Sequence, residues 1–128
     1  MAESGVILET SVLVDYLRGH PPALQWMRDL PAEASITFVT AAELLAGCRN
    51  RREQRLIEQE LRNYEVLWGS VKSSATALAW FRQYHLSHGV GFLDCLIGAI
   101  AEEAGAPLYT LNESHFSPLP GLVTRRPY

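Results

Sequence analysis

Short apolar runs alternate along the chain with longer segments in which apolar residues recur every three or four positions. The first run, residues 6–8, is wholly apolar, which predicts a strand buried on both faces, as in a parallel sheet. Further strands are predicted at residues 36–39, 66–68 and 108–110, and residues 122–123 are a candidate for a last edge strand.

Helices are predicted between these strands, at residues 12–17, 23–29, 41–48, 51–63, 73–86 and 92–104. The predicted N-caps are Thr10 or Ser11, Thr40, Asn50, and Ser73 or Ser74. We expect the fifth helix to bury the face formed by Ala77, Leu78, Phe81 and Leu86. Strands that alternate with helices predict one α/β domain over residues 1–128, with a mostly parallel central sheet flanked by helices.

Composition narrows the possible classes of protein. The chain has 128 residues, 48% of them hydrophobic and 20% charged, which is typical of a globular domain and not of a disordered chain. Its net charge is −3, so binding to nucleic acid would need a local basic patch, a metal ion or a partner chain rather than overall positive charge.

Location is predicted from three further features. No apolar run is long enough to cross a membrane, and the first four residues contain no basic residue of the kind that begins a secretory signal. Cys48 and Cys95 lie in apolar helical segments, which favours two buried, reduced thiols. We therefore expect a cytoplasmic protein with no membrane association.

Candidate catalytic residues follow from the rule that sites in open α/β sheets lie beyond the carboxyl ends of the strands. Glu9 follows the first strand, Glu43 lies in the predicted first turn of the helix after the second, and Asn112 follows residues 108–110. Asp94 stands inside an otherwise apolar run, where an unpaired carboxylate is costly. Carboxylates that converge favour Mg²⁺ or Mn²⁺ over zinc, and such a site suits hydrolysis of a phosphodiester.

Each of these residues also has a simpler interpretation. Glu43 can be a solvated acid that the helix dipole favours, and Glu9 can belong to a surface turn. Asp94 can be a helix N-cap, and Asn112 an ordinary turn residue. Spacing alone therefore predicts only an acidic site in an α/β domain.

Four segments of the chain resemble, in order, the motifs of PIN-domain ribonucleases of the VapC toxin type. They are VILETSVLVDYL at residues 6–17, TAAELLAG at 40–47, FLDCLIGAIA at 92–101 and LYTLNESHF at 108–116. The acidic positions of the family correspond to Glu9, Glu43 and Asp94, and its Asp or Asn followed by a His-Phe pair corresponds to Asn112.

The resemblance implies a PIN fold and a Mg²⁺- or Mn²⁺-dependent endoribonuclease that cleaves structured RNA such as tRNA or ribosomal RNA. It also implies a homodimer and a cognate VapB-type antitoxin that blocks the site in a toxin–antitoxin complex. In such a site Glu9, Glu43 and Asp94 hold the metal directly or through water, and Asn112 positions a water or a phosphate oxygen. Thr10 or Ser11 would add a hydroxyl, and the pair at 115–116 would anchor the loop.

One position departs from the family, because Glu9 stands where the family has Asp. The longer side chain moves the carboxylate by about 1.5 Å, whereas Mg²⁺ requires ligand distances of ~2.0–2.1 Å. We expect Glu9 to weaken or displace the metal and to lower activity. The alternative is a catalytically impaired PIN-fold protein that binds an antitoxin or RNA without turnover.

Another Mg²⁺-dependent phosphohydrolase is disfavoured, because the chain has no Gly-rich phosphate loop and no Asp-x-Asp after the first strand. The basic stretch formed by Arg49, Arg51, Arg52 and Arg55 is either a contact surface for RNA or an acidic antitoxin, or a solvated helix face.

Overall fold

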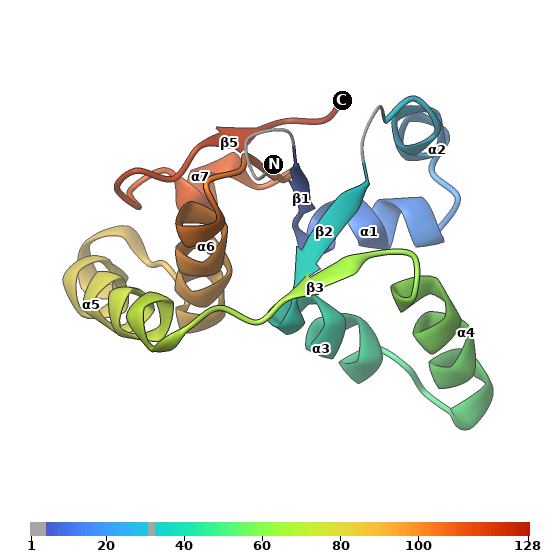
Figure 1. Ribbon diagram of the computed structural model, residues 1–128, viewed down its shortest axis with the longest axis horizontal. Helices are drawn as coiled ribbons and strands as arrows, with labels where there is room; N and C mark the ends of the chain where they lie inside the picture. The colour runs from blue at the N-terminus through green and yellow to red at the C-terminus, as the bar shows by residue number, and fades with distance from the viewer. Residues whose placement is uncertain (1–4, 31–32) are drawn as a thin grey trace.

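The structure, a computed structural model, describes residues 5–30 and 33–128. Within these residues a 5-stranded sheet has the strand order β3-β2-β1-β4-β5, and every neighbouring pair of strands is parallel (Figure 1). The strands are β1 (Val6–Leu8), β2 (Ala34–Thr37), β3 (Glu65–Leu67), β4 (Leu108–Tyr109) and β5 (Thr124–Arg125). The predicted α/β class with a parallel sheet is confirmed.

Helices cover both faces of the sheet. The helices are α1 (Thr10–Leu17), α2 (Pro21–Arg28), α3 (Phe38–Ala46), α4 (Arg51–Leu61), α5 (Val71–His88), α6 (Phe92–Ala104) and α7 (Glu113–Phe116). In Figure 1, α5 and α6 lie to one side of the sheet and α1, α2 and α4 to the other. No helix within the described ranges is both long enough and apolar enough to span a membrane. Met1 to Ser4 lie outside the described residues.

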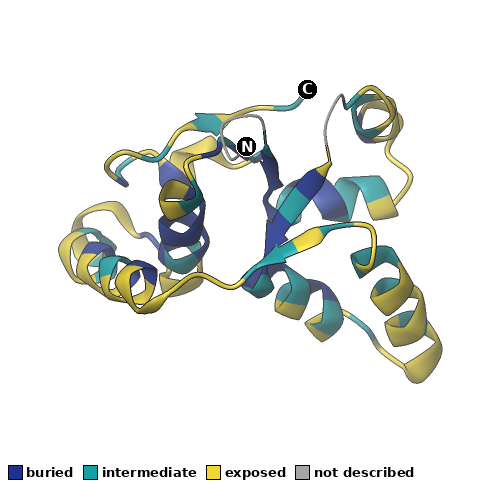
Figure 2. Ribbon diagram, in the orientation of Figure 1, coloured by how far each residue is buried: buried dark blue, intermediate teal, exposed yellow. Residues whose placement is uncertain are grey.

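The central strand explains why the run 6–8 is apolar throughout. Ile7 points into the core cluster that includes residues of α5 and α6, whereas Val6 and Leu8 point into the cluster that includes residues of α1, α3 and β2. Successive side chains of a strand point to opposite faces, so a strand between two cores has no face left for polar residues. In Figure 2, β1, most of β2 and the middle of α6 are buried, whereas α4 and α5 are largely exposed.

Several of the predicted element boundaries were wrong. The β2 strand ends at Thr37, whose hydroxyl caps α3 by accepting from the backbone N of Thr40 at 3.3 Å, so the apolar residues 38–39 are helical. The cap of α5 is Ser70 rather than Ser73 or Ser74, and α1 begins after Glu9 with no side-chain cap. Asn50 caps α4 as predicted.

The predicted buried face of α5 was also wrong. Ser73, Ala77 and Trp80 are its buried residues, whereas Leu78 is 53% and Leu86 is 88% exposed. Small residues at positions 73 and 77 let α5 pack closely on α6. Cys95 is buried as predicted, whereas Cys48 is only half-buried.

The last two elements also differ from prediction. The edge strand is 124–125 rather than 122–123, and the predicted loop after β4 contains the short helix α7.

Candidate active site at the carboxyl edge of the sheet

The acidic residues meet beside β1, the strand from which the sheet extends in both directions. Crossover connections lead from β1 to β2 on one side, and β4 lies on the other, so the carboxyl ends of β1 and β4 form the topological switch point of the sheet. The two ends are joined directly, because the backbone N of Glu9 donates to the carbonyl of Tyr109 at 2.9 Å. Ligand sites in open α/β sheets lie at such points.

Glu9 is only 6% exposed and its carboxylate connects α1 to the end of β4. The Oε1 atom accepts from the hydroxyls of Ser11 and Thr110, both at 2.6 Å. Ser11 Oγ in turn accepts from the backbone N of Leu111 at 3.1 Å, and Thr110 Oγ1 accepts from the backbone N of Asn112 at 3.0 Å. The interpretation of Glu9 as a surface-turn residue is therefore wrong.

The second oxygen of Glu9 is not fully enclosed by protein atoms. Among the described residues, Oε2 accepts no hydrogen bond, and no fully buried side-chain oxygen or nitrogen lacks a partner. Oε2 is thus the atom of this carboxylate that remains available to a ligand.

Glu43 lies on α3 and is held by a second pair of hydroxyls. Thr10 Oγ1 donates to Glu43 Oε1 at 2.6 Å and lies 2.9 Å from Thr40 Oγ1. A hydroxyl has one proton, so Thr40 is the donor in the second bond. Because α3 begins at Phe38, Glu43 is past its first turn, and the interpretation of Glu43 as a first-turn acid is wrong.

Asp94 lies in the first turn of α6, whose N-cap is Gly91, so the N-cap interpretation of Asp94 is also wrong. Its Oδ2 atom is 3.5 Å from Nδ1 of His115. Partial burial raises the pKa of Asp94, the negative charges of Glu9 and Glu43 raise it further, and His115 opposes the shift. Glu9 and Glu43 therefore lie close enough to Asp94 to act on it, as expected if the three carboxylates line one site.

The donor set suits a hard divalent cation. Carboxylate and hydroxyl oxygens surround the site, and a cation would relieve the repulsion that raises the pKa of Asp94. In the part of the chain that the structure describes, no three His, Cys, Asp or Glu side chains are arranged to bind one ion together. An ion at this site would be held by some of these residues directly and by others through water, as Mg²⁺ commonly is in proteins.

Asn112 and the His115–Phe116 pair follow β4. Asn112 is exposed and is the N-cap of α7, without a side-chain capping bond. Phe116 is 1% exposed and packs in the core cluster shared with α5 and α6. The predicted anchoring of this loop by residue 116 is confirmed, and it brings His115 to Asp94.

A groove of about 840 Å³ runs from Glu43 between α1, α3 and α4. Glu43 is the one of the three acids that lines it, and part of its wall is apolar: Val14, Leu17, Leu44, Leu56 and Ile57. Leu17 and Leu56 are 38% and 55% exposed. An occupant of this groove would reach the acidic site at Glu43.

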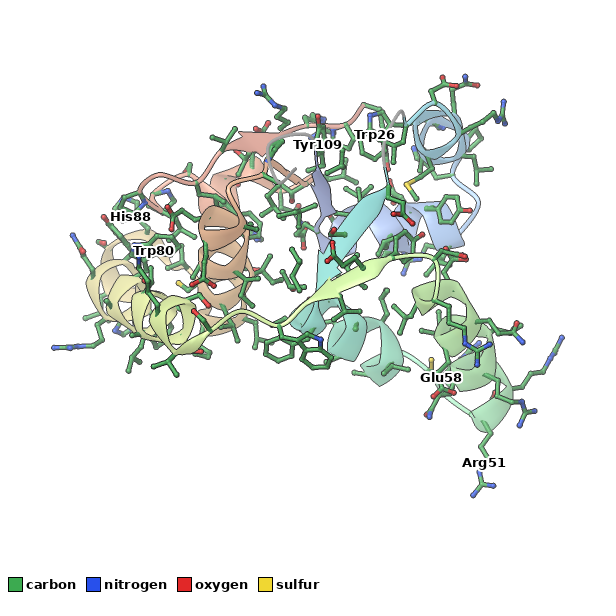
Figure 3. The ribbon with its side chains drawn as sticks, in the orientation of Figure 1. Trp26, Arg51, Glu58, Trp80, His88 and Tyr109 are labelled. Atoms are coloured by element: carbon green, nitrogen blue, oxygen red, sulfur yellow. The ribbon has the colours of Figure 1, made fainter. Side chains whose placement is uncertain are left out.

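The basic stretch of the sequence lies at and beside α4. Arg49 pairs with Glu53 at 2.8 Å, and this contact raises the pKa of Arg49 and lowers that of Glu53. Figure 3 shows Arg51 projecting from the outer end of α4 into solvent. One arginine is thus paired and another solvated, and the role of the stretch as a contact surface stays a prediction.

A family model for the PIN domain matches residues 6–120. The chain belongs to the PIN-domain family. Among its curated relatives, this PIN domain is 33% identical over 122 residues to ribonuclease VapC19 of Mycobacterium tuberculosis, covering 91% of this chain and 95% of the relative. It is 32% identical over 116 residues to ribonuclease VapC10 of the same organism, covering 87% of this chain and 85% of that one. The predicted resemblance to VapC-type PIN domains is confirmed.

Solved structures show the same fold. A toxin–antitoxin complex from Klebsiella pneumoniae superposes with a TM-score of 0.79 at 21% identity, covering 96% of this chain and 98% of that one. DNA-bound VapBC from Salmonella typhimurium superposes with a TM-score of 0.80 at 19% identity, covering 97% and 98%. These structures support the fold of the PIN domain independently of the sequence matches.

Sequence reasoning missed two hydroxyls of this PIN domain. Thr110 and Thr40 are both fully buried, and they support Glu9 directly and Glu43 through Thr10. The sequence shows a Thr at the end of an apolar strand, but it does not show which carboxylate that Thr supports until the strand register is known.

Proposed function

We propose that this chain is a metal-dependent endoribonuclease of the toxin type, acting on structured RNA such as tRNA or ribosomal RNA. The observation that carries the proposal is the convergence of Glu9, Glu43 and Asp94 at the switch point of the sheet, where the first and second raise the pKa of the third. The names of its relatives as ribonucleases support the same conclusion.

In this proposal each side chain of the site has a separate role. Glu9 through Oε2, Glu43 and Asp94 hold Mg²⁺ or Mn²⁺, directly or through water. When bound, the ion stabilises charge on the phosphate oxygens and activates the attacking water. The hydroxyls of Ser11 and Thr110 fix Glu9, and that of Thr10 fixes Glu43. Asn112, exposed beside them, donates its amide to a phosphate oxygen or a water.

The test is cleavage of total bacterial RNA by purified protein. We expect cleavage with Mg²⁺ or Mn²⁺, none with EDTA, and none with Asp94→Asn. The matched control is Asp29→Asn, which removes an exposed carboxylate at the end of α2 and should cleave normally. Wild-type protein that leaves RNA intact with both ions, or an Asp94→Asn variant as active as the control, contradicts the proposal.

The second candidate is a PIN-fold protein that binds RNA or an antitoxin without turnover. It is favoured by Glu9, because two hydroxyls already occupy its Oε1 and only Oε2 is left for a cation. Glu9→Asp distinguishes the two readings. We expect RNA cleavage to rise, since the shorter acid releases those hydroxyls and returns the family's ligand; if cleavage does not rise, Glu9 is not the defect.

We also propose a VapB-type antitoxin as partner and a homodimer as the toxin unit. Two solved structures similar to this chain are named as toxin–antitoxin or VapBC complexes. The groove beside Glu43 is suited to an amphipathic segment of an antitoxin, because apolar residues line it next to the charged Arg18 and Arg49.

The groove proposal is tested by co-expression with the product of a small reading frame next to the gene, followed by purification and sedimentation. Leu56→Glu should abolish co-purification and release RNA cleavage. Leu86→Glu, on the exposed face of α5, is the control and should leave the complex intact. Equal co-purification of both variants would place the antitoxin elsewhere.

A further inference from the structure

The segment after β5 lies at the same edge of the sheet as the acidic site, on the far side of β4. Since β5 is parallel to β4, residues 126–128 emerge at the same edge of the sheet as Glu9 and Thr110. The backbone N of Thr110 donates to the carbonyl of Arg125 at 3.0 Å, so this edge is continuous from β1 to β5. The segment lies beyond residues 6–120, which match the family model. Figure 1 shows it running from β5 towards the side of α2.

Two contacts fix this segment in place. Arg126 Nη1 donates to the carbonyl of Leu111 at 3.2 Å, and Leu111 is the residue whose backbone N binds the Ser11 hydroxyl that supports Glu9. The Tyr128 hydroxyl donates to Asp15 Oδ2 at 2.8 Å. The segment is therefore attached to the loop that carries Asn112 and to α1.

Arg126 is chemically free to bind an anion. Within residues 5–30 and 33–128 its guanidinium makes this one hydrogen bond and no salt bridge, and the residue is exposed, so most of its five donors face solvent. A site formed by three carboxylates repels a polyanion such as RNA, and a cation at its rim offsets that repulsion. The planar fork of arginine matches a phosphate group better than the point charge of lysine does.

We propose that Arg126 binds a backbone phosphate of RNA next to the acidic site, and that Tyr128 is a positioning residue for it. This inference rests on the proposed nuclease function, because it takes RNA as the ligand of that site. It assigns substrate binding to a segment outside the matched PIN-domain residues.

The test measures binding of a fluorescein-labelled, single-stranded oligoribonucleotide of mixed sequence in EDTA, at several salt concentrations. Arg126→Ala should weaken binding about tenfold, as expected for one charge-assisted contact, and should reduce the salt slope of log K by about 0.7. Arg126→Lys should keep the slope while losing part of the affinity. Arg82→Ala, which removes an exposed charge from α5, is the matched control and should bind like the wild type.

Tyr128→Phe separates positioning from charge. It removes the bond to Asp15 but keeps the ring and every cation, so we expect weaker binding with an unchanged salt slope. If Arg126→Ala behaves like Arg82→Ala, or weakens binding without changing the slope, Arg126 does not contact phosphate. That result would refute the phosphate contact and leave the proposed nuclease activity standing, because cleavage by the wild type is measured separately. If instead the wild type cleaves no RNA but its binding depends on Arg126, the nuclease proposal is refuted and the phosphate contact stands.

Discussion

Thr110 offers the sharpest test of how the acidic site is held together. Its side chain is fully buried, donates to Glu9 Oε1 at 2.6 Å and accepts from the backbone N of Asn112 at 3.0 Å. Thr110→Val keeps the shape of the side chain and removes both bonds. Thr110→Ser keeps the hydroxyl and removes only a buried methyl group, so it is the matched control.

The magnitude follows from the kind of bond that is lost. A hydrogen bond to a charged group contributes about 1.5–3 kcal/mol, and Glu9 is buried enough for that range to apply. The N–H of Asn112 belongs to an exposed residue, so water replaces its partner at little cost. We therefore expect Thr110→Val to lower the free energy of unfolding by about 2–3 kcal/mol. Thr110→Ser should lower it by about 1 kcal/mol, as for other losses of one buried methyl group.

Urea unfolding in EDTA, followed by fluorescence of the three tryptophans, measures both values. In a thermal scan a domain of this size loses roughly 3–5 °C in Tm per kcal/mol, so the valine variant should melt about 6–15 °C lower. A double-mutant cycle with Glu9→Gln should show that the two losses are not additive. Should the valine variant equal or exceed the serine variant in stability, the hydroxyl does not support Glu9 as the geometry implies.

Three further outcomes are expected. In EDTA, Asp94→Asn should unfold at a higher temperature than the wild type at neutral pH, because a raised folded-state pKa means that ionised Asp94 destabilises the fold. The difference should shrink as pH falls through the folded-state pKa and vanish below ~4, where Asp94 is protonated in both states; a constant difference would contradict it. Gly69→Ala should lower the free energy of unfolding by about 2–4 kcal/mol, since its Cβ would lie 2.7 Å from Ser73 Oγ at φ +77°. Gly19→Ala, at the same φ with nothing within 4 Å, should lower it by only about 1 kcal/mol because of backbone strain. Equal urea midpoints for the two variants would refute the contact. Mn²⁺ at a hundred times its Kd should raise the free energy of unfolding of the wild type by about 2.7 kcal/mol, and its Tm accordingly. The Tm of Asp94→Asn should not change with Mn²⁺; a similar rise in both proteins would place the ion elsewhere.

The fold class was predictable because the apolar residues of a buried strand form a short continuous run in the sequence. The apolar run 6–8 required a strand with two buried faces, and β1 has them. The start of α3 was not predictable from hydrophobicity, because Phe38 and Val39 are as apolar in a helix as in a strand. There the hydroxyl of Thr37 decides, since it caps the helix.

The face of α5 failed for a different reason. The pattern favoured Leu78 and Leu86, but the buried face of α5 is formed by Ser73, Ala77 and Trp80. A Cβ on Gly98 of α6 would lie 2.8 Å from Leu119 and 3.2 Å from Leu122, so the segment after α7 closes the space there, whereas Trp80 of α5 would be at an ordinary contact distance of 3.7 Å. Hydrophobic spacing indicates which residues are apolar, but it does not indicate how closely two helices approach each other.

The acids of the site were located by a rule about sheet edges, whereas their supports depend on register. The bond between Thr110 and Glu9 joins residues 101 positions apart, and it exists because β1 and β4 pair Leu8 with Tyr109. A sequence pattern gives the acid and the hydroxyl separately. Only the pairing of the strands turns them into one unit.

That unit leaves the three acids unequal. Glu9 and Glu43 each accept short bonds from hydroxyls, whereas Asp94, among the described residues, has only the imidazole of His115 at 3.5 Å. The carboxylate with the weakest support is also the one whose pKa the other two raise. In a rigid arrangement of this kind, the gain from a bound cation is greatest at Asp94, because hydroxyl groups already donate short hydrogen bonds to Glu9 and Glu43 and none donates to Asp94 among the described residues. Ionised Asp94 therefore lowers the stability of the fold while it contributes to metal binding. Replacing Asp94 should separate fold stability from metal binding more clearly than replacing Glu9 or Glu43.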